Sequence, residues 1–419
     1  MNLGILSLIF LLVAIAFGFF RKMNTGLVAI GLALVIGRIG GMADTKIIGG
    51  FSASLFVMLL GVTYLFSMAQ VNGTLELFAK KAVALAGKNT RLVPIVIYLL
   101  ATFLAAIGPG TIPVMALMAV FTMALAAEMK VSPLLLSSMG LLGAMAGGIS
   151  PIAPTGIIGI TLAAKQGYTD IATPFFLNSL IGESIFALFL YFVLGGYKIT
   201  AETPIKFKDL PKFNRNQVIT LIGVAAMVIG VMFLKVNVGL MAFAVAGVLS
   251  FLNVAKEKDA IANVPWGTLL LVTGVGVLMN VVIELKGIKL LATFLGTFMT
   301  ETSASPVIGL TAGVMSWFSS TSGVVMPTLI PTVSELIKTI GSNNVYPVDL
   351  ISAITNTAHT AGLSPVSTGG ALALASYVAN THVSEEEQHK LFLKMFAVAV
   401  GGVIFMSILA WLGIYRIFI

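Results

Sequence analysis

The sequence predicts an all-α polytopic membrane protein, built from two inverted five-span repeats that each hold a re-entrant hairpin and a broken helix. The prediction depends on an apolar composition, an internal repeat and helix breaks at matching places. Of the 419 residues, 58% are hydrophobic and 10% are charged, whereas soluble proteins carry about 25% charged residues. Because a span needs about 20 apolar residues, the chain holds about ten spans with short loops and no sizeable soluble domain.

The composition also excludes several classes of function. The chain has no cysteine and three histidines, which excludes disulfides, thiolate nucleophiles and cysteine-ligated metals and leaves no convincing zinc site. The net charge of +8 fits lysines in loops that face the cytoplasmic membrane surface better than it fits nucleic-acid binding. The N-terminal run 3–20 has no basic region before it and no cleavage site before Arg21, so it is interpreted as a span rather than a signal peptide.

An internal repeat divides the chain into two homologous halves. Lys22-x-Asn24-x-Gly26-Leu27-x-Ala29 recurs 213 residues later as Lys235-x-Asn237-x-Gly239-Leu240-x-Ala242. At an offset of 214, matching pairs are Gly73 and Gly287, Pro113 and Pro327, Ser150-Pro151 and Ser364-Pro365, and Gly156 and Gly370. The predicted units are a first repeat, 1–197, a cytoplasmic linker, 198–215, and a second repeat, 216–419.

The first half contains every expected element in order. Apolar runs predict spans at 3–20, 26–42 and 52–70, and the basic amphipathic stretch 75–91 predicts a helix on the membrane surface. The apolar pair 92–107 and 112–127 is split by Gly108-Pro109-Gly110, which is too tight for two full spans and predicts a re-entrant hairpin. The run 133–149 meets two prolines and a glycine before it resumes to 164, as in a helix broken within the membrane. A span at 172–195 completes the half.

The second half repeats this pattern. Spans are expected at 217–234, 239–252 and 265–283, followed by a hairpin at 306–337, a broken helix at 349–377 and a last span at 390–414. Five crossings per half is an odd number, so the second half must be inverted relative to the first. Placing the linker in the cytoplasm gathers 16 of the 24 basic residues on that side, which by the positive-inside rule predicts that both termini are external.

Four interruptions of helical backbone at membrane depth predict an internal polar site. Discontinuous helices direct the positive ends of their dipoles at such a site, while hydroxyls and free carbonyls coordinate small cations. This combination favours an anion bound together with a cation. The residues expected to bind substrate are Gly110, Thr111, Thr155, Ser320, Thr321, Ser322, Asn356, His359, Ser367 and Thr368, and those expected to bind a cation, with sodium as the candidate metal ion, are Gly108, Ser150, Gly156, Ser319, Gly323 and Ser364.

Two polar residues inside the spans have alternative interpretations. His359 is one turn from Asn356 and is either a charge that contacts the anion or a hydrogen-bonded packing residue. Glu183 lies in the middle of the span 172–195. It is either a protonated partner in an interhelical hydrogen bond or part of a path for the coupling ion.

The chain resembles the ion transporter superfamily. The resemblance rests on the two five-span repeats, the hydroxyl-rich tip at 319–323 and the paired breaks Ser150-Pro151-Ile152-Ala153-Pro154-Thr155-Gly156 and Ser364-Pro365-Val366-Ser367-Thr368-Gly369-Gly370. Within it, the sequence is similar to bacterial dicarboxylate carriers of the malonate-carrier (MatC-like) and divalent anion/sodium symporter group. The resemblance implies a homodimeric secondary transporter in the bacterial inner membrane that moves carboxylates by an elevator motion, with sodium at the hairpin tips and helix breaks.

The hairpin tips depart from the Ser-Asn-Thr pattern of those symporters. The first tip is Ile107-Gly108-Pro109-Gly110-Thr111 and the second is Ser319-Ser320-Thr321-Ser322, neither with asparagine. Coupling to sodium, coupling to protons and exchange therefore all stay open.

The expected function is cation-coupled transport of a small organic anion, a C3 or C4 dicarboxylate, with no cofactor besides Na⁺ or H⁺ and with the lipid bilayer as surroundings. The alternatives are the large membrane subunit of a tripartite, binding-protein-dependent carboxylate transporter and an anion channel. An intramembrane enzyme is not expected, because only His359 and Ser364 come near a catalytic pair.

Overall fold

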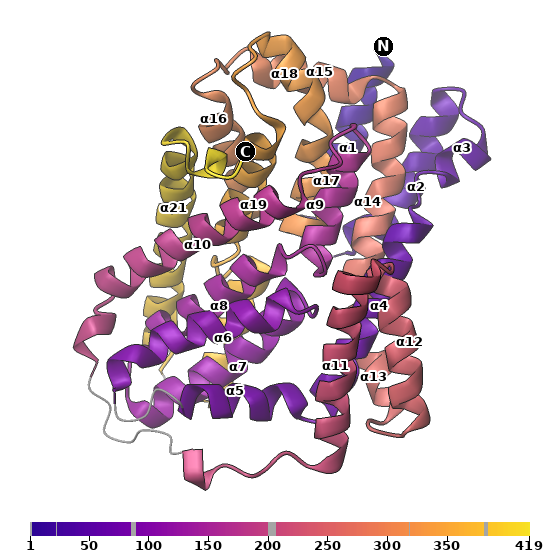
Figure 1. Ribbon diagram of the computed structural model, residues 1–419. Helices are drawn as coiled ribbons and strands as arrows, with labels where there is room; N and C mark the ends of the chain where they lie inside the picture. Colours follow the sequence, from indigo (N-terminus) through magenta and orange to yellow (C-terminus); the bar gives the residue numbers. More distant parts are fainter. Residues whose placement is uncertain (1, 22, 85–88, 200–206, 318, 381–383) are drawn as a thin grey trace.

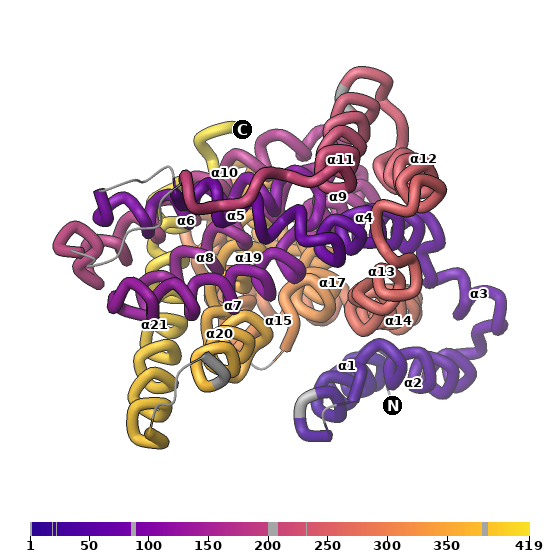
Figure 2. The backbone as a smooth tube through the Cα atoms, turned by 90° about the horizontal axis from the view of Figure 1, so that it is seen from below, coloured from indigo at the N-terminus to yellow at the C-terminus, as the bar shows by residue number. Residues whose placement is uncertain are grey.

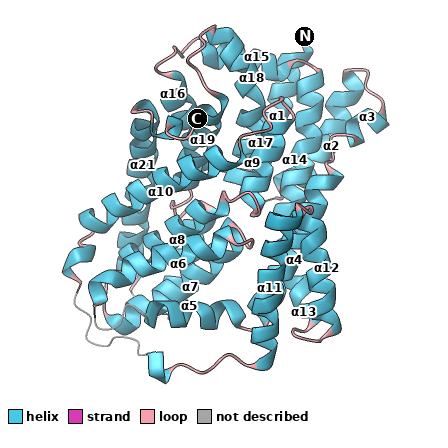
Figure 3. Ribbon diagram, in the orientation of Figure 1, coloured by secondary structure: helices cyan, strands magenta, loops and turns pink. Residues whose placement is uncertain are grey.

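The computed structural model describes residues 2–21, 23–84, 89–199, 207–317, 319–380 and 384–419. In these ranges the chain consists of helices and connecting turns, without a β-strand (Figure 3). The predicted all-helical class is therefore confirmed. The linker predicted at 198–215 lies partly outside the described residues.

The helices of the first half follow the predicted order. They are α1 (Leu3–Arg21), α2 (Thr25–Ile39), α3 (Asp44–Ile48), α4 (Ala53–Val71), α5 (Thr74–Ala84), η1 (Thr90–Leu92), α6 (Val93–Ala106), α7 (Thr111–Met129), α8 (Pro133–Gly148), α9 (Pro154–Ala164), α10 (Ala172–Val193) and η2 (Gly196–Lys198).

The rest of the chain forms η3 (Phe207–Asp209), α11 (Arg215–Leu234), α12 (Val238–Phe251), α13 (Glu257–Asn263), α14 (Trp266–Glu284), α15 (Gly287–Gly296), α16 (Ala304–Trp317), η4 (Thr321–Val325), α17 (Met326–Leu329), η5 (Ile330–Thr332), α18 (Val333–Ile340), α19 (Pro347–Ala361), α20 (Thr368–Asn380), α21 (Glu385–Trp411) and η6 (Ile414–Arg416).

Local sequence explains where many of these helices begin. The Asn24 side chain accepts a hydrogen bond from the Gly26 backbone N–H, and Asn237 does the same for Gly239 at the start of α12. Such caps satisfy backbone donors that have no partner within the helix. Prolines occupy the first turn of α8, α9 and α19, where a missing N–H costs nothing.

Six helical segments of the described chain are long and apolar enough to cross a bilayer. They are Asp44–Val71, Thr111–Met129, Ala172–Val193, Trp266–Glu284, Thr321–Ile340 and Glu385–Trp411. Shorter apolar helices, among them Leu3–Gly18 and Thr25–Ile39, occupy other predicted spans. The chain is therefore a multi-pass membrane protein.

The helices divide into two packing groups. We define the scaffold group as α1–α4 and α11–α14, and the site group as α6–α10 and α16–α21; the helices of each group pack mainly with one another. In Figures 1 and 2 the scaffold group lies on the right and the site group on the left. The site group interleaves the two halves of the chain, since α7 packs against α20 and α10 against α19.

Two glycine contacts join the scaffold helices with their backbones nearly touching. A Cβ atom on Gly274 of α14 would lie 2.2 Å from the Gly26 carbonyl oxygen of α2. A Cβ atom on Gly61 of α4 would lie 2.4 Å from the Gly239 carbonyl oxygen of α12. Neither approach leaves space for a side chain, which explains the glycines at these positions.

The structure adds detail that the sequence patterns lack. The first part of the predicted surface helix 75–91 is α5, which lies crosswise near the bottom of Figure 1, and residues 85–88 of that prediction lie outside the described residues. Short helices α3 and α13 fill connections in which no helix was expected. The returning arm of the second hairpin is not one continuous α-helix, because a π-helical turn and a 3₁₀ turn, η4 and η5, interrupt it near Pro327 and Pro331.

Candidate functional site

The four interruptions predicted from the sequence meet at one small cavity. Its volume is about 40 Å³, and its lining comes from both hairpins and both broken helices: Thr111, Ile112, Met115, Met145, Thr155, Ser320, Thr321, Ser322, His359, Gly362, Ser367, Thr368 and Gly369. The structure thus brings together eight of the ten predicted substrate residues, leaving out Gly110 and Asn356. We call this space the central cavity.

Glycine geometry shapes the first hairpin tip. Gly108 and Gly110 have φ values of +143° and +77°, in the region that favours glycine. A Cβ atom on Gly110 would lie 2.5 Å from the Pro154 ring, so the tip fits closely against the start of α9. The Thr111 and Thr155 hydroxyl oxygens, 3.1 Å apart, form a hydrogen bond across this contact.

Hydroxyls hold the second hairpin tip against α19. The Thr321 hydroxyl donates to the Ala358 carbonyl at 2.9 Å and lies 2.9 Å from the Ser316 hydroxyl. The Ser320 hydroxyl accepts from the Gly323 backbone N–H at 3.2 Å. The Ser319 hydroxyl donates to the Met315 carbonyl at 2.7 Å. These bonds fix the tip while leaving hydroxyl lone pairs able to accept a hydrogen bond or coordinate a cation.

The two helix breaks have matching backbone contacts. A Cβ atom on Gly156 would lie 2.1 Å from the Ser150 carbonyl oxygen, and one on Gly370 would lie 2.3 Å from the Ser364 carbonyl oxygen. In both breaks the helix that resumes therefore starts directly against carbonyls of the segment before it. The first residues of α7, α9 and α20 all border the central cavity, so three positive helix ends lie around it.

His359 and Asn356 lie at different depths on α19. His359 borders the central cavity, is 3% exposed and has an Nδ1 atom without a hydrogen-bond partner. Asn356 is fully buried and does not border the cavity, and neither of its amide atoms has a partner among the described residues. Asn356 therefore lies outside the lining of the central cavity.

The predicted cation residues do not border the central cavity. Ser150, Ser364, Gly108, Gly156 and Gly323 lie behind its lining, within the breaks and tips. Ser319 borders a second, larger cavity of about 410 Å³, which shares Ser320, Ser367 and Thr368 with the central one. Within the described ranges, no three histidine, aspartate or glutamate side chains form a group that could hold a metal ion.

The larger cavity includes residues that the sequence did not point to. Ile15, Gly18 and Thr25 come from α1 and α2, and Leu271 comes from α14. They belong to the scaffold group and have no motif of their own, so only the packing of the two groups places them beside the site. Among the described residues, neither cavity is lined by Lys, Arg, Asp or Glu.

Comparisons with known proteins agree with this architecture. Residues 1–148 match a family model described as the dicarboxylate carrier protein MatC N-terminus. A search of curated proteins found no match. Among solved structures, the fold is similar to that of the YdaH transporter of Alcanivorax borkumensis, with a TM-score of 0.55 and 11% sequence identity over 88% of this chain and 87% of that chain. The first 148 residues therefore resemble the N-terminal part of a dicarboxylate carrier, and the chain as a whole is folded like a membrane transporter.

Proposed function

We propose that the protein is a secondary active transporter of a small organic anion, a C3 or C4 dicarboxylate, coupled to a cation. The observation that carries the proposal is the central cavity, where hydroxyls from two hairpin tips and two helix breaks meet three helix N-termini inside the membrane-spanning part. Irregular backbone at this depth is found where it surrounds an internal site. The family match over residues 1–148 supports a dicarboxylate as the substrate.

The charge of the lining supports the proposed coupling of the anion to a cation. Each helix N-terminus contributes about half a positive charge, and no Lys or Arg borders either cavity. Hydroxyls add hydrogen bonds but no net charge. A dianion held in this way is incompletely neutralised, so a sodium ion or proton that binds with it increases its affinity. We assign the sodium option to the carbonyls and hydroxyls at the tips and breaks around Ser150 and Ser364.

We further propose that the halves 1–197 and 216–419 are inverted repeats. Support comes from the two glycine contacts of the scaffold, because Gly26 and Gly239 are equivalent positions, 213 residues apart, as are Gly61 and Gly274. Gly26 meets Gly274, and Gly239 meets Gly61. Reciprocal contacts of this kind are expected from a two-fold relation between similar units.

The cavity volumes support an elevator motion. A volume of about 40 Å³ accommodates an ion or a few water molecules but not a dicarboxylate with its ligands. The adjoining cavity of about 410 Å³ lies between the site group and the scaffold group and falls in the size range of small-molecule sites. In our proposal the anion enters where these cavities meet, and the site group then slides past the scaffold in a homodimer of the bacterial inner membrane.

The test is uptake of a panel of labelled dicarboxylates into proteoliposomes that contain only the purified chain. Each gradient, of sodium or of protons, is imposed alone. We expect one of them to raise the internal concentration of a labelled dicarboxylate above its external concentration. Uptake by the purified chain alone, without a binding protein or a second subunit, would exclude a tripartite transporter. Accumulation of the dicarboxylate against its own concentration gradient would exclude a channel. Absence of uptake for every carboxylate under both gradients would refute the proposal.

A further inference from the structure

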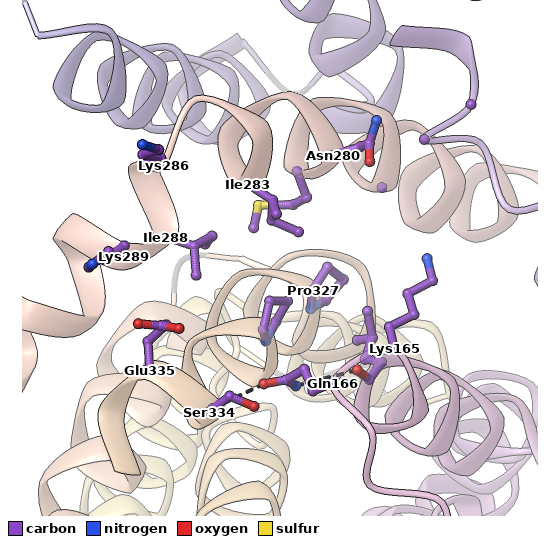
Figure 4. A pocket seen from close by; sticks show the side chains of 16 residues that line it. Lys165, Gln166, Asn280, Ile283, Lys286, Ile288, Lys289, Pro327, Ser334 and Glu335 are labelled. Carbon is purple, nitrogen blue, oxygen red and sulfur yellow. Dashed lines mark hydrogen bonds between the residues drawn. The ribbon is translucent and has the colours of Figure 1, made fainter. Parts of the chain in front are cut away.

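A second large cleft lies away from the central cavity and shares no residue with it. Its volume is about 410 Å³, and it opens between α14 and α15 on one side and α9, α17 and α18 on the other (Figure 4). One wall includes Met279 and Ile288, which pack in the core of α1, α2 and α14. The other wall packs with the site group. The cleft therefore follows a boundary between two packing units.

Three lysines line this cleft from both walls. Lys165 extends into it from the end of α9, and Lys286 and Lys289 line the opposite wall at the start of α15 (Figure 4). Within the ranges that the structure describes, none of the three ammonium groups has an ion pair or a hydrogen bond. The single carboxylate of the lining, on Glu335, is paired with Lys338 at 2.8 Å. The cleft thus has an uncompensated positive charge.

The neutral polar groups of the cleft are already engaged with protein. The Gln166 side chain donates to the Ile330 carbonyl at 2.8 Å and accepts from the Ser334 backbone N–H at 3.1 Å. The Asn280 amide donates to the Lys46 carbonyl at 3.0 Å. These bonds hold the walls in place, so the lysines are the groups available to a ligand.

The cleft and the central cavity lie at opposite ends of the same elements. On α9, Thr155 borders the cavity and Lys165 follows the last residue of the helix. A rise of about 1.5 Å per residue separates them by roughly 15 Å. Ser322 and Ser334 are likewise at the tip and toward the base of the second hairpin. The cleft is therefore on the face from which that hairpin enters the fold.

We propose that this cleft is an anion-collecting vestibule, a second and weaker site that concentrates small carboxylates next to the transport pathway. The inference rests on the proposed function and adds to it a place of first contact. Clefts lined by charge of one sign raise association rates by about 10- to 1,000-fold. Salt screens such attraction over about 8–10 Å at physiological ionic strength, so the effect of the vestibule depends on ionic strength.

The first test measures transport kinetics. The variant Lys165→Gln/Lys286→Gln/Lys289→Gln should have a KM raised severalfold at low ionic strength and an unchanged maximal rate. The wild-type KM should rise with added salt, while that of the variant should change little. Lys235→Gln, outside the cleft, is the matched control and should behave as wild type. Equal KM values and equal salt dependence in variant and wild type would overturn the vestibule while leaving the transport function intact.

A second test needs no transport at all. Ile283 lines the cleft and is 48% exposed, and the chain contains no native cysteine. The measured quantity is the ratio of the reaction rate with an anionic thiosulfonate reagent to the rate with a cationic one. This ratio should be higher for Ile283→Cys than for Asn343→Cys, which lies in an exposed loop. Removing the three lysine charges or adding salt should reduce this preference. The absence of any preference would overturn the proposal, even if carboxylate uptake were observed.

Discussion

Two threonine hydroxyls connect the hairpin tips to the neighbouring broken helices. Thr155 is hydrogen-bonded to Thr111, and Thr321 to both Ser316 and the Ala358 carbonyl. We expect Thr155→Val and Thr321→Val to lower dicarboxylate uptake by at least about tenfold. The reason is that a buried group left without its hydrogen-bond partner costs about 1–3 kcal/mol, and about 1.4 kcal/mol corresponds to a factor of ten.

The matched control is Thr122→Val in α7. Thr122 is fully buried, borders neither cavity and donates only to the Met118 carbonyl in its own helix. This variant should retain uptake close to that of wild type. Size-exclusion profiles should show that all three variants fold. Normal rate and affinity in both site variants would mean that the central cavity does not bind substrate.

His359 is the one residue of the described lining that gains a positive charge on protonation. If a protonated His359 supplies the charge, lowering the pH, in a range where the ligand stays fully ionised, strengthens dianion binding to the wild type. His359→Gln should abolish this pH dependence and keep any dependence on sodium, as measured by binding of labelled ligand. His389→Gln, on an exposed position of α21, is the control.

The outcomes separate two sources of charge. A pH dependence that persists in His359→Gln would assign the charge to a coupling proton elsewhere. Binding that does not respond to pH, sodium or His359 would mean that the ligand is neutral or zwitterionic, and the dicarboxylate proposal would then be withdrawn.

The position of a single residue could be predicted from the sequence where only a few residue types suit that position. Hydroxyls beside Pro and Gly within apolar runs, such as Thr155 and Ser367, were identified because few residue types suit a helix break in a membrane. Asn356 was expected at the site and is buried behind it. The depth of Asn356 depends on how α19 packs against its neighbours. The spacing of residues along a single helix does not determine that packing.

At the scale of elements, the glycines that follow the breaks are tightly constrained positions. Gly156→Ala and Gly370→Ala would each place a methyl group within 2.3 Å of a backbone carbonyl oxygen. Since the obstacle is backbone, we expect a loss of about 1–3 kcal/mol, seen as a lower melting temperature in detergent, together with reduced uptake.

Gly401→Ala provides the comparison, because a Cβ atom there meets nothing within 4 Å. It lies in the long helix α21, where alanine is the better helix former. Its melting temperature should be equal to or above that of wild type. If all three variants melted alike, the close contacts at the breaks would have no energetic importance.

Element types and order followed from the sequence because Pro, Gly and hydrophobic runs act locally. Helices α3 and α13 were missed because segments of five and seven residues are too short to have a clear periodicity. The π-helical turn η4 was also missed. It is fixed by the contact of Thr321 with Ala358, 37 residues away, which no local pattern records.

For the whole molecule, the proposed inverted arrangement predicts the sidedness of its loops. The cysteine-free chain allows single cysteines at Lys212, in the linker, and at Asn343, before α19. A membrane-impermeant thiol reagent added to intact cells should label Asn343→Cys, whereas Lys212→Cys should react only after permeabilisation. Labelling of both from outside would exclude the inverted-repeat model.

The sequence repeat leads to the proposal that the two halves pair, but it contains no information on how the two helix groups pack. The 410 Å³ cleft around Lys165 and Lys289 joins residues more than a hundred positions apart. No sequence pattern singles out those lysines. Cavity volumes also depend on the conformation that the chain adopts. Because one sequence is compatible with several conformations, it does not determine these volumes.

The absence of Lys, Arg, Asp and Glu from the described lining of both site cavities has a consequence for energetics in a polarised membrane. Moving one elementary charge through 100 mV involves about 2.3 kcal/mol. When His359 is neutral, the unloaded binding residues carry no formal charge, so the membrane voltage does no work on their return. In the proposed cycle, voltage then acts on these residues only when they are loaded, through the charges of the dianion and its coupling cations. The stoichiometry of those cations would decide whether a cell's resting potential drives or opposes uptake.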